Sequence, residues 1–233
     1  MAERSKVAVV AGANSGLGSA LCERLSKRGF RPVALGRADA VRVVAAAVPG
    51  TLAVACDLTV PAEVDRAFTA IEETAGPASA VVYNAHRLEL RPSAETSLDV
   101  FEGSWRVNCL GAFVVARRAV PGMLALQGGT LVFSGATGSV RGGNRSAAFA
   151  SSKFALRGLA QSLARELSPA GVHVAHVVLD GLVWSERTRA RFAPREDACM
   201  SPDAVAAAYL GLIEQERSAW THELDLRPWT GPF

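Results

Sequence analysis

The stretch Gly12-Ala13-Asn14-Ser15-Gly16-Leu17-Gly18 decides how this chain folds. It follows an apolar, valine-rich run, Lys6–Ala11, and opens a segment with helical spacing, Ser15–Arg28. Glycines permit a tight turn and let backbone N–H groups approach a diphosphate, whose charge the helix N-terminus favours. This turn at the first strand-to-helix junction therefore predicts a dinucleotide site. The alternative is a turn whose glycines serve only close packing of the helix on the strand.

Apolar runs and helical segments alternate along the rest of the chain. Strands are expected at Lys6–Ala11, Pro32–Gly36, Thr51–Cys56, Ala80–Tyr83, Thr130–Phe133, Val172–Leu179 and Ala219–Leu226. Further helices are expected at Ala62–Thr74, Leu98–Arg118, Ala147–Ser168 and Asp203–Gln215. Strands that are apolar throughout are buried on both faces, as in a parallel sheet covered by helices. We predict an α/β protein: a single domain (residues 1–233) with a doubly wound Rossmann fold and a seven-stranded parallel sheet flanked by helices on both faces.

Composition narrows the possible partners and compartment. The chain has 233 residues, 49% hydrophobic, and a net charge of +3 spread along its length, so a nucleic-acid partner is not indicated. Residues 1–6 lack the apolar core of a signal peptide, and we expect no membrane-spanning run. We expect a cytoplasmic protein with reduced thiols and no metal site, because its cysteines are widely spaced. They are Cys22, Cys56, Cys109 and Cys199.

The glycine spacing, Gly-x-x-x-Gly-x-Gly, resembles that of the short-chain dehydrogenase/reductase family. Further motifs follow in the family's order: Asp57-Leu58, Tyr83-Asn84-Ala85-His86, Trp105-Arg106-Val107-Asn108 and Phe149-Ala150-Ser151-Ser152-Lys153. The resemblance implies an oxidoreductase that transfers hydride between a nicotinamide cofactor and a small carbonyl or alcohol substrate. The expected cofactor-binding residues are Gly12, Asn14, Ser15, Gly16, Leu17, Gly18, Arg37, Asp57, Leu58, Asn84, Ala85, Lys153 and Val183.

Arg37 bears on the choice of cofactor, since it follows the second predicted strand directly. An acidic residue at this place in the fold binds the ribose hydroxyls of NAD, whereas an arginine accommodates the 2′-phosphate of NADP. Asp39 lies two residues later, past the expected contact point. The sequence therefore favours NADP(H) over NAD(H). The alternative is that Arg37 is a solvated turn residue and either cofactor binds.

The catalytic centre departs from the family's pattern at Phe149, which stands where the resemblance implies a tyrosine. A phenol donates and accepts a proton, and a benzyl ring does neither. Lys153, four residues later on the same predicted helix, shares the face of Phe149 and is expected to contact the nicotinamide ribose. A positioned general acid contributes about 10²–10⁴-fold to rate. Weak or atypical activity is therefore expected.

The resemblance implies Asn108, Ser134 and Lys153 as catalytic residues. Alignment on the glycines puts Gly135 in the serine's place, and Ser134 then faces away from the substrate unless the turn is remodelled. For Asn108, a structural role is an open alternative. His86 is a candidate acid–base group or a residue that only lines the cleft. Two further histidines are expected to be structural: His173 and His176.

Residues 181–200 resemble the family's substrate loop. They carry Arg187, Arg189, Arg191 and Arg195, which fit either an anionic substrate or a solvated lid. The predicted helices Leu98–Arg118 and Ala147–Ser168 resemble the family's subunit interface, which implies a homodimer or homotetramer. Two alternatives to an NADP-dependent oxidoreductase stay open. One is a catalytically impaired regulatory protein that binds the cofactor, and the other is an enzyme that uses the cleft for a non-redox step.

Overall fold

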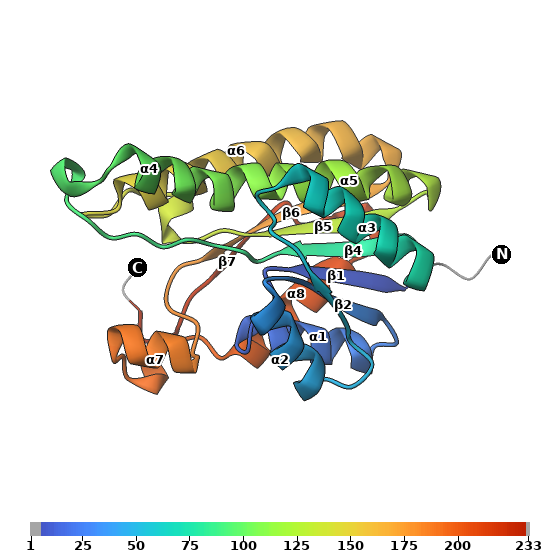
Figure 1. Cartoon of the computed structure of the whole chain (residues 1–233), viewed down its shortest axis with the longest axis horizontal. Coiled ribbons are helices and arrows are strands. Elements are labelled where there is room, and N and C mark those ends of the chain that lie inside the picture. The colour runs from blue at the N-terminus through green and yellow to red at the C-terminus, as the bar shows by residue number, and fades with distance from the viewer. Residues whose placement is uncertain (1–5, 232–233) are drawn as a thin grey trace.

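A parallel seven-stranded sheet forms the centre of the computed structural model, as the sequence predicts (Figure 1). The strand order is β3-β2-β1-β4-β5-β6-β7. The strands are β1 (Val7–Ala11), β2 (Arg31–Gly36), β3 (Leu52–Ala55), β4 (Ala78–Tyr83), β5 (Gly129–Ser134), β6 (Val172–Leu179) and β7 (Glu223–Leu226). The structure describes residues 6–231. The first five residues and the last two, which the single-domain and signal-peptide expectations include, lie outside the described residues.

Helices cover both faces of the sheet (Figure 1). One face carries α3 (Pro61–Ala75), α5 (Gly111–Ala125) and α6 (Ala147–Leu167), and α4 (Leu98–Trp105) packs beside α6. The other face carries α1 (Leu17–Lys27), α2 (Ala38–Ala47) and α8 (Pro202–Ile213). Side chains alternate along each strand, so each strand contributes to both apolar layers. Leu131 and Phe133 of β5 face the layer that contains α5, whereas Val132 faces the layer that contains α8.

Two helices were not predicted, and one predicted helix is divided. The missed helices are α2 and α7 (Glu186–Phe192). The helix α2 buries Val41 and Val44, which lie three residues apart, whereas α7 has no buried residue. The predicted helix Leu98–Arg118 is interrupted by a π-helical turn, Arg106–Leu110, and then continues beyond its predicted end to Ala125. Hydrophobic spacing does not register the insertion of one residue into a continuous helix.

The expectation that no segment is long enough to span a membrane was wrong by length and composition. The continuous helical stretch Leu98–Ala125 has 28 residues, and its most apolar 18-residue window has a mean hydropathy of 1.2 and is 44% buried. A helix in the core of a water-soluble protein has the same properties, so this stretch is weak evidence for a membrane span.

The chain reverses its winding direction between β1 and β4, and the site forms there. From β1 the chain adds β2 and β3 on one side, and it then returns to place β4 on the other. Gly12 follows β1 with a φ of +82°, and a Cβ added to it would lie 2.4 Å from the backbone nitrogen of Ala85, which follows β4. Only glycine permits this approach. The two loops therefore meet at the switch point, where open α/β sheets bind ligands.

Candidate active site

Two adjoining cavities lie at the carboxyl ends of the strands. The first, of about 230 Å³, contains Lys153 and Phe149 in its wall, and we call it the lysine cavity. The second, of about 460 Å³, contains Arg37 and Asp57, and we call it the Arg37 cavity. Both cavities border α7, which stands at this end of the sheet (Figure 1).

All but one of the thirteen residues expected to bind the cofactor line these cavities. The Arg37 cavity is lined by Gly12, Asn14, Arg37, Asp57, Leu58, Asn84 and Ala85. The lysine cavity is lined by Asn14, Ser15, Gly16, Leu17, Asn84, Lys153 and Val183. The exception is Gly18, whose added Cβ would lie 2.8 Å from the Cα of Ala13. Gly18 therefore serves the packing of α1 on the glycine loop.

The glycine loop fits a dinucleotide because its backbone faces the cavities with few side chains in the way. A Cβ added at Gly16 would lie 3.2 Å from the Cβ of Ser185, so Gly16 keeps the passage between the loop and α7 open. The side chain of Asn14 shapes the loop by accepting the Gly16 N–H through Oδ1 at 3.0 Å. The backbone at the start of α1 thus borders an elongated cleft, as diphosphate binding requires.

Arg37 lies at the far end of this cleft. It is exposed, precedes α2 and lines the Arg37 cavity together with Ala40, whereas Asp39 does not border that cavity. Asp57 lines the same cavity and accepts hydrogen bonds from the backbone N–H and hydroxyl of Thr59, at 2.8 and 2.7 Å. The end of the cleft therefore offers one guanidinium and one carboxylate that is already engaged locally.

Lys153 is a buried lysine that borders the lysine cavity. Its Nζ donates a hydrogen bond to the carbonyl oxygen of Ser134 at 2.7 Å, and it lies 6.0 Å from the centre of the Phe149 ring. No carboxylate among the described residues forms an ion pair with it. Burial lowers the pKa of Lys153 to about 7, because an apolar environment disfavours the ammonium form. The amine therefore exchanges a proton near neutral pH.

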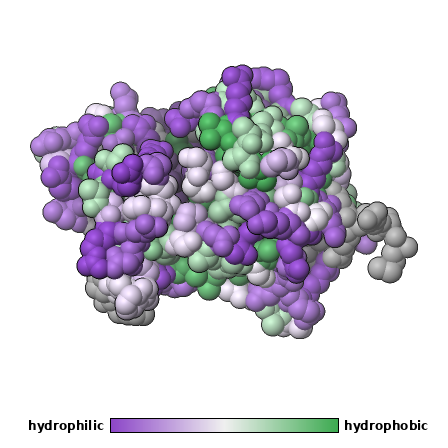
Figure 2. Space-filling model, turned by 90° about the horizontal axis from the view of Figure 1, so that it is seen from below, coloured by the Kyte–Doolittle hydropathy of each residue, from purple (hydrophilic) through white to green (hydrophobic). Residues whose placement is uncertain are grey.

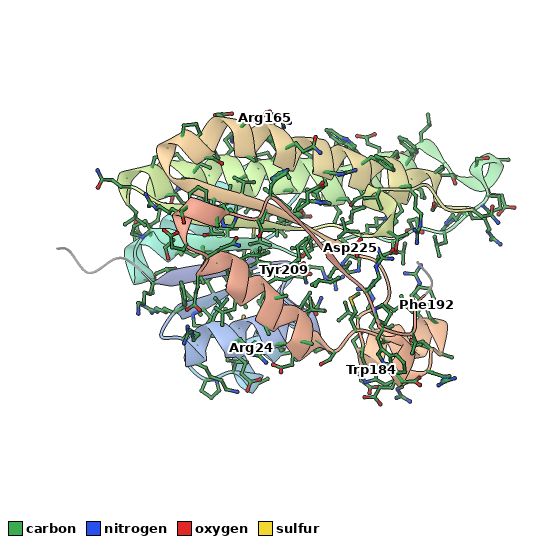
Figure 3. All side chains as sticks on the ribbon, turned by 180° about the vertical axis from the view of Figure 1, so that it is seen from behind. Arg24, Arg165, Trp184, Phe192, Tyr209 and Asp225 are labelled. Atoms are coloured by element: carbon green, nitrogen blue, oxygen red, sulfur yellow. The ribbon has the colours of Figure 1, made fainter. Side chains whose placement is uncertain are left out.

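The side chain of Ser134 points away from Lys153. Its hydroxyl accepts a hydrogen bond from the phenol of Tyr209 at 2.9 Å and donates to Oδ1 of Asn84 at 3.2 Å. Tyr209 projects from α8 toward the sheet (Figure 3). Ser134 therefore presents its carbonyl oxygen to Lys153 and its hydroxyl to the opposite layer. Thr137 is also engaged, since its hydroxyl donates to Asp180 at 2.6 Å.

Gly135, aligned with the family's serine, has no room for a side chain. An added Cβ would lie 2.3 Å from Nε2 of His176 and 2.8 Å from the carbonyl oxygen of Val177. His176 is fully buried, and its Nδ1 lies 3.4 Å from a carboxylate oxygen of Glu223. Burial lowers the pKa of His176 to about 4, so the imidazole is neutral at pH 7. The space behind this turn therefore holds an imidazole.

Asn108 lies outside the lining of both cavities. Its side chain is fully buried, and its Oδ1 accepts the backbone N–H of Arg87 at 2.8 Å. Its Nδ2 donates to the carbonyl oxygen of Arg87 at 3.0 Å and to the hydroxyl of Ser152 at 2.8 Å. These bonds join the π-helical turn to the loop after β4 and to α6. The geometry supports a structural role for this amide.

His86 lines both cavities and is exposed within the cleft. Its Nδ1 lies 3.4 Å from the carbonyl oxygen of Asn84. The surrounding cleft walls lower the pKa of His86 to about 4 by desolvation, and the positive charge of Lys153 lowers it further. The imidazole is therefore neutral at pH 7 and cannot act as an imidazolium acid.

The segment 181–200 contributes several cavity residues that the sequence analysis did not single out. Those in the lysine cavity include Leu182, Trp184, Ser185, Thr188 and Phe192. Trp184 and Phe192 lie on the part of the chain that contains α7, beside the ends of the strands (Figure 3). Ser185 is the one residue whose type could have indicated a helix start here in the sequence. Its hydroxyl accepts the Thr188 N–H at 3.1 Å and caps α7.

Comparisons with known proteins agree with this architecture. Residues 6–195 match the family described as short chain dehydrogenase. The chain is 36% identical to the 3-oxoacyl-(acyl-carrier-protein) reductase MabA of Mycobacterium bovis over 186 residues, which cover 80% of this chain and 72% of the relative. It is 33% identical to carbonyl reductase family member 4 of Danio rerio, over 90% of this chain and 92% of that protein.

Solved structures show the same fold. A short-chain dehydrogenase from Rhodopseudomonas palustris superposes with a TM-score of 0.84 at 34% identity, covering 97% of this chain and 100% of that chain. A 3-ketoacyl-(acyl-carrier-protein) reductase from Brucella melitensis, complexed with NADH, has a TM-score of 0.86 at 24% identity; the match covers 96% of this chain and 97% of that chain. The matched family region includes the glycine loop, Lys153 and Arg187, so this chain belongs to the short-chain dehydrogenase family of oxidoreductases.

Proposed function

We propose that this protein is an NADP-dependent reductase of small carbonyl compounds in which Lys153 donates the proton. In this proposal Phe149 stands in place of the family's catalytic tyrosine. The observation that carries it is the position of Lys153: a buried amine beside the Phe149 ring, in the wall of the lysine cavity. The matched relatives that are named as reductases support the direction of the reaction.

The chemistry divides between the cofactor and the chain. When bound, the nicotinamide supplies the hydride that reduces the carbonyl carbon. The chain supplies the proton: the Lys153 ammonium donates it from Nζ to the carbonyl oxygen, forming the alcohol, and the neutral amine is reprotonated from solvent. The hydrogen bond to Ser134 holds Nζ in place during this exchange. Mostly apolar neighbours, among them Leu182 and Trp184, favour an uncharged body on the substrate.

Other candidate donors are less suited to this role. The hydroxyl of Ser134 is directed to Tyr209 and Asn84, and the amide of Asn108 is engaged outside the cavities. The low pKa of His86 leaves it without an ionised proton at neutrality. A general acid is most effective when its pKa lies near the working pH, and the pKa of Lys153 is about 7.

The pH dependence of reduction tests this proposal. The donor must be protonated, so the ammonium form below pH 7 is active and the neutral amine above it is not. At saturating NADPH, kcat for reduction should be level near pH 6 and fall about tenfold per pH unit well above 7. Stopped-flow measurement of NADPH oxidation with a panel of apolar ketones provides the readout.

Lys153→Arg and Lys153→Met are the matched variants. The arginine variant keeps its charge to high pH, so its residual kcat should not fall between pH 7 and 9. The methionine variant should lose about 10²–10⁴-fold in kcat, even when saturation with NADPH is verified separately. A wild-type kcat that stays level to pH 9 would contradict Lys153 as the donor. NADPH binding without turnover of any ketone would instead favour the regulatory alternative.

Restoration of a phenol should increase activity. Phe149→Tyr adds a hydroxyl in the cavity wall beside Lys153, where a nearby ammonium lowers the pKa of a phenol. We expect kcat to rise about 10–100-fold on a ketone that the parent protein already reduces. Phe30→Tyr, a half-buried position that directly precedes β2 and lines neither cavity, is the control and should leave kcat unchanged. Equal rates for the two variants would show that the reacting carbonyl does not lie beside Phe149.

The proposed preference for NADP rests on Arg37, which lines the cleft while Asp39 does not. A hydrogen bond to a charged group contributes about 1.5–3 kcal/mol, which is roughly 10–100-fold in affinity. Arg37→Gln should therefore weaken NADPH binding by that factor and leave NADH binding nearly unchanged. Arg42→Gln, an exposed change on α2, is the control, with isothermal titration calorimetry as the measurement. Parallel losses for NADPH and NADH would contradict the assignment.

We also propose that the protein assembles with itself through α4, α5 and α6. These helices expose large apolar side chains: Leu98, Phe101, Trp105, Phe113 and Phe154. Exposed apolar surface on neighbouring helices is typical of protein interfaces. Sedimentation velocity should show a dimer or tetramer that dissociates in Trp105→Glu. Val43→Glu, an exposed apolar position on α2 across the sheet, should leave it intact. A monomeric parent protein would refute this interface.

A further inference from the structure

The four arginines in residues 181–200 fall into two pairs. Arg189 forms an ion pair with Glu186 at 2.7 Å, and Arg195 forms one with Asp197. Among the described residues, no carboxylate lies within ion-pair distance of Arg187 or Arg191. The charges of Arg189 and Arg195 are therefore neutralised by neighbouring carboxylates on the surface. Arg187 and Arg191 retain their positive charge.

The two arginines without a carboxylate face the cleft. Arg187 and Arg191 lie four residues apart on α7 and therefore share one face of that helix. Each lines both the lysine cavity and the Arg37 cavity. Hydrophilic residues gather over the α7 end of the face seen in Figure 2. The six residues common to the two cavities are Asn14, Asn84, His86, Leu88, Arg187 and Arg191.

Residues common to both cavities mark the middle of the cleft. The glycine loop borders this middle from one side, and α7 borders it from the other. Gly16 lies near Ser185 across this region, because a Cβ added at Gly16 would lie 3.2 Å from the Ser185 Cβ. Arg187 follows Ser185 by two residues and lines the same cavity as Ser15 and Gly16 of the glycine loop.

Charge in this middle region is strongly unbalanced. Asp57 and Glu89 are the carboxylates in the cavity walls; Asp57 is engaged by Thr59, and Glu89 by Arg87 and Arg91. The charges of Arg187 and Arg191 contribute to the low pKa of His86, so their positive charge acts on the part of the cleft that His86 lines. A group with negative charge is therefore the complementary occupant.

We propose that Arg187 binds the diphosphate of the dinucleotide from the α7 side of the cleft, opposite the glycine loop. This inference rests on the proposed function, because the midpoint of an elongated dinucleotide is its diphosphate. Arg191 has a different role. Its Nη2 donates a hydrogen bond to the carbonyl oxygen of Leu88 at 3.0 Å, which holds α7 against the loop after β4. A guanidinium matches the geometry of phosphate oxygens with two parallel hydrogen bonds.

Binding of cofactor fragments tests the role of Arg187. The probes are NADPH and ADP-ribose, which contain the diphosphate, and adenosine 2′-monophosphate, which lacks it. Arg187→Gln should weaken binding of the first two about 10–100-fold and change the third by less than about twofold. Arg189→Gln, on the same helix but paired with Glu186, is the control and should leave all three affinities unchanged. Isothermal titration calorimetry measures each affinity without turnover.

The possible outcomes separate this inference from the proposed function. NADPH bound equally by the parent protein and by Arg187→Gln would overturn the diphosphate assignment and leave the reductase proposal standing. If the variant also raised KM for an anionic ketone, the arginine would belong to the substrate. A parent protein that binds neither NADPH nor ADP-ribose would overturn the proposed function itself. Equal weakening of the adenosine monophosphate would refute a local diphosphate contact.

Discussion

Desolvation of the Lys153 amine is the constraint on which the candidate active site depends. The amine is enclosed by the fold, has the Ser134 carbonyl as its hydrogen-bond acceptor, and lies beside the Phe149 ring rather than a carboxylate. An unfolded lysine has a pKa of about 10.4, whereas burial lowers the pKa of Lys153 in the fold to about 7. The unfolded chain therefore binds this proton more tightly between those values. Lys153 opposes folding below pH 7, and this opposition is relieved as the pH rises through that window.

The neighbours of Lys153 form a consistent set. Gly135 has no room for a side chain, because the imidazole of His176 fills the space behind it. The hydroxyl of Ser134 is turned to the α8 layer, where Tyr209 holds it. In our proposal the phenol is absent as well, so positions 134, 135 and 149 present no free hydroxyl to Lys153. This arrangement keeps the wall near Lys153 apolar and preserves the low pKa of Lys153.

The fold could be predicted from the sequence because buried parallel strands and the glycine turn give strong local signals. The run Val172–Leu179 was placed at its correct ends, and the predicted seven-stranded parallel sheet was confirmed. The short helix α7 was missed because it packs one polar face on a cleft and has no buried apolar stripe. The cleft could be predicted in the same way, since twelve of the thirteen expected cofactor residues line it. The engagement of Asn108 by Arg87 and the orientation of Ser134 depend on tertiary contacts that spacing does not encode.

The pKa of Lys153, measured on the folded protein, tests the proposed proton donor most directly. Selective ¹³C labelling of lysine Cε, with the Lys153 resonance assigned by comparison with Lys153→Arg, permits an NMR titration across the neutral and alkaline range. We predict a midpoint near 7, well below those of the exposed lysines Lys6 and Lys27. A Lys153 midpoint above about 10, together with those of the exposed lysines, would contradict a proton donor at this position.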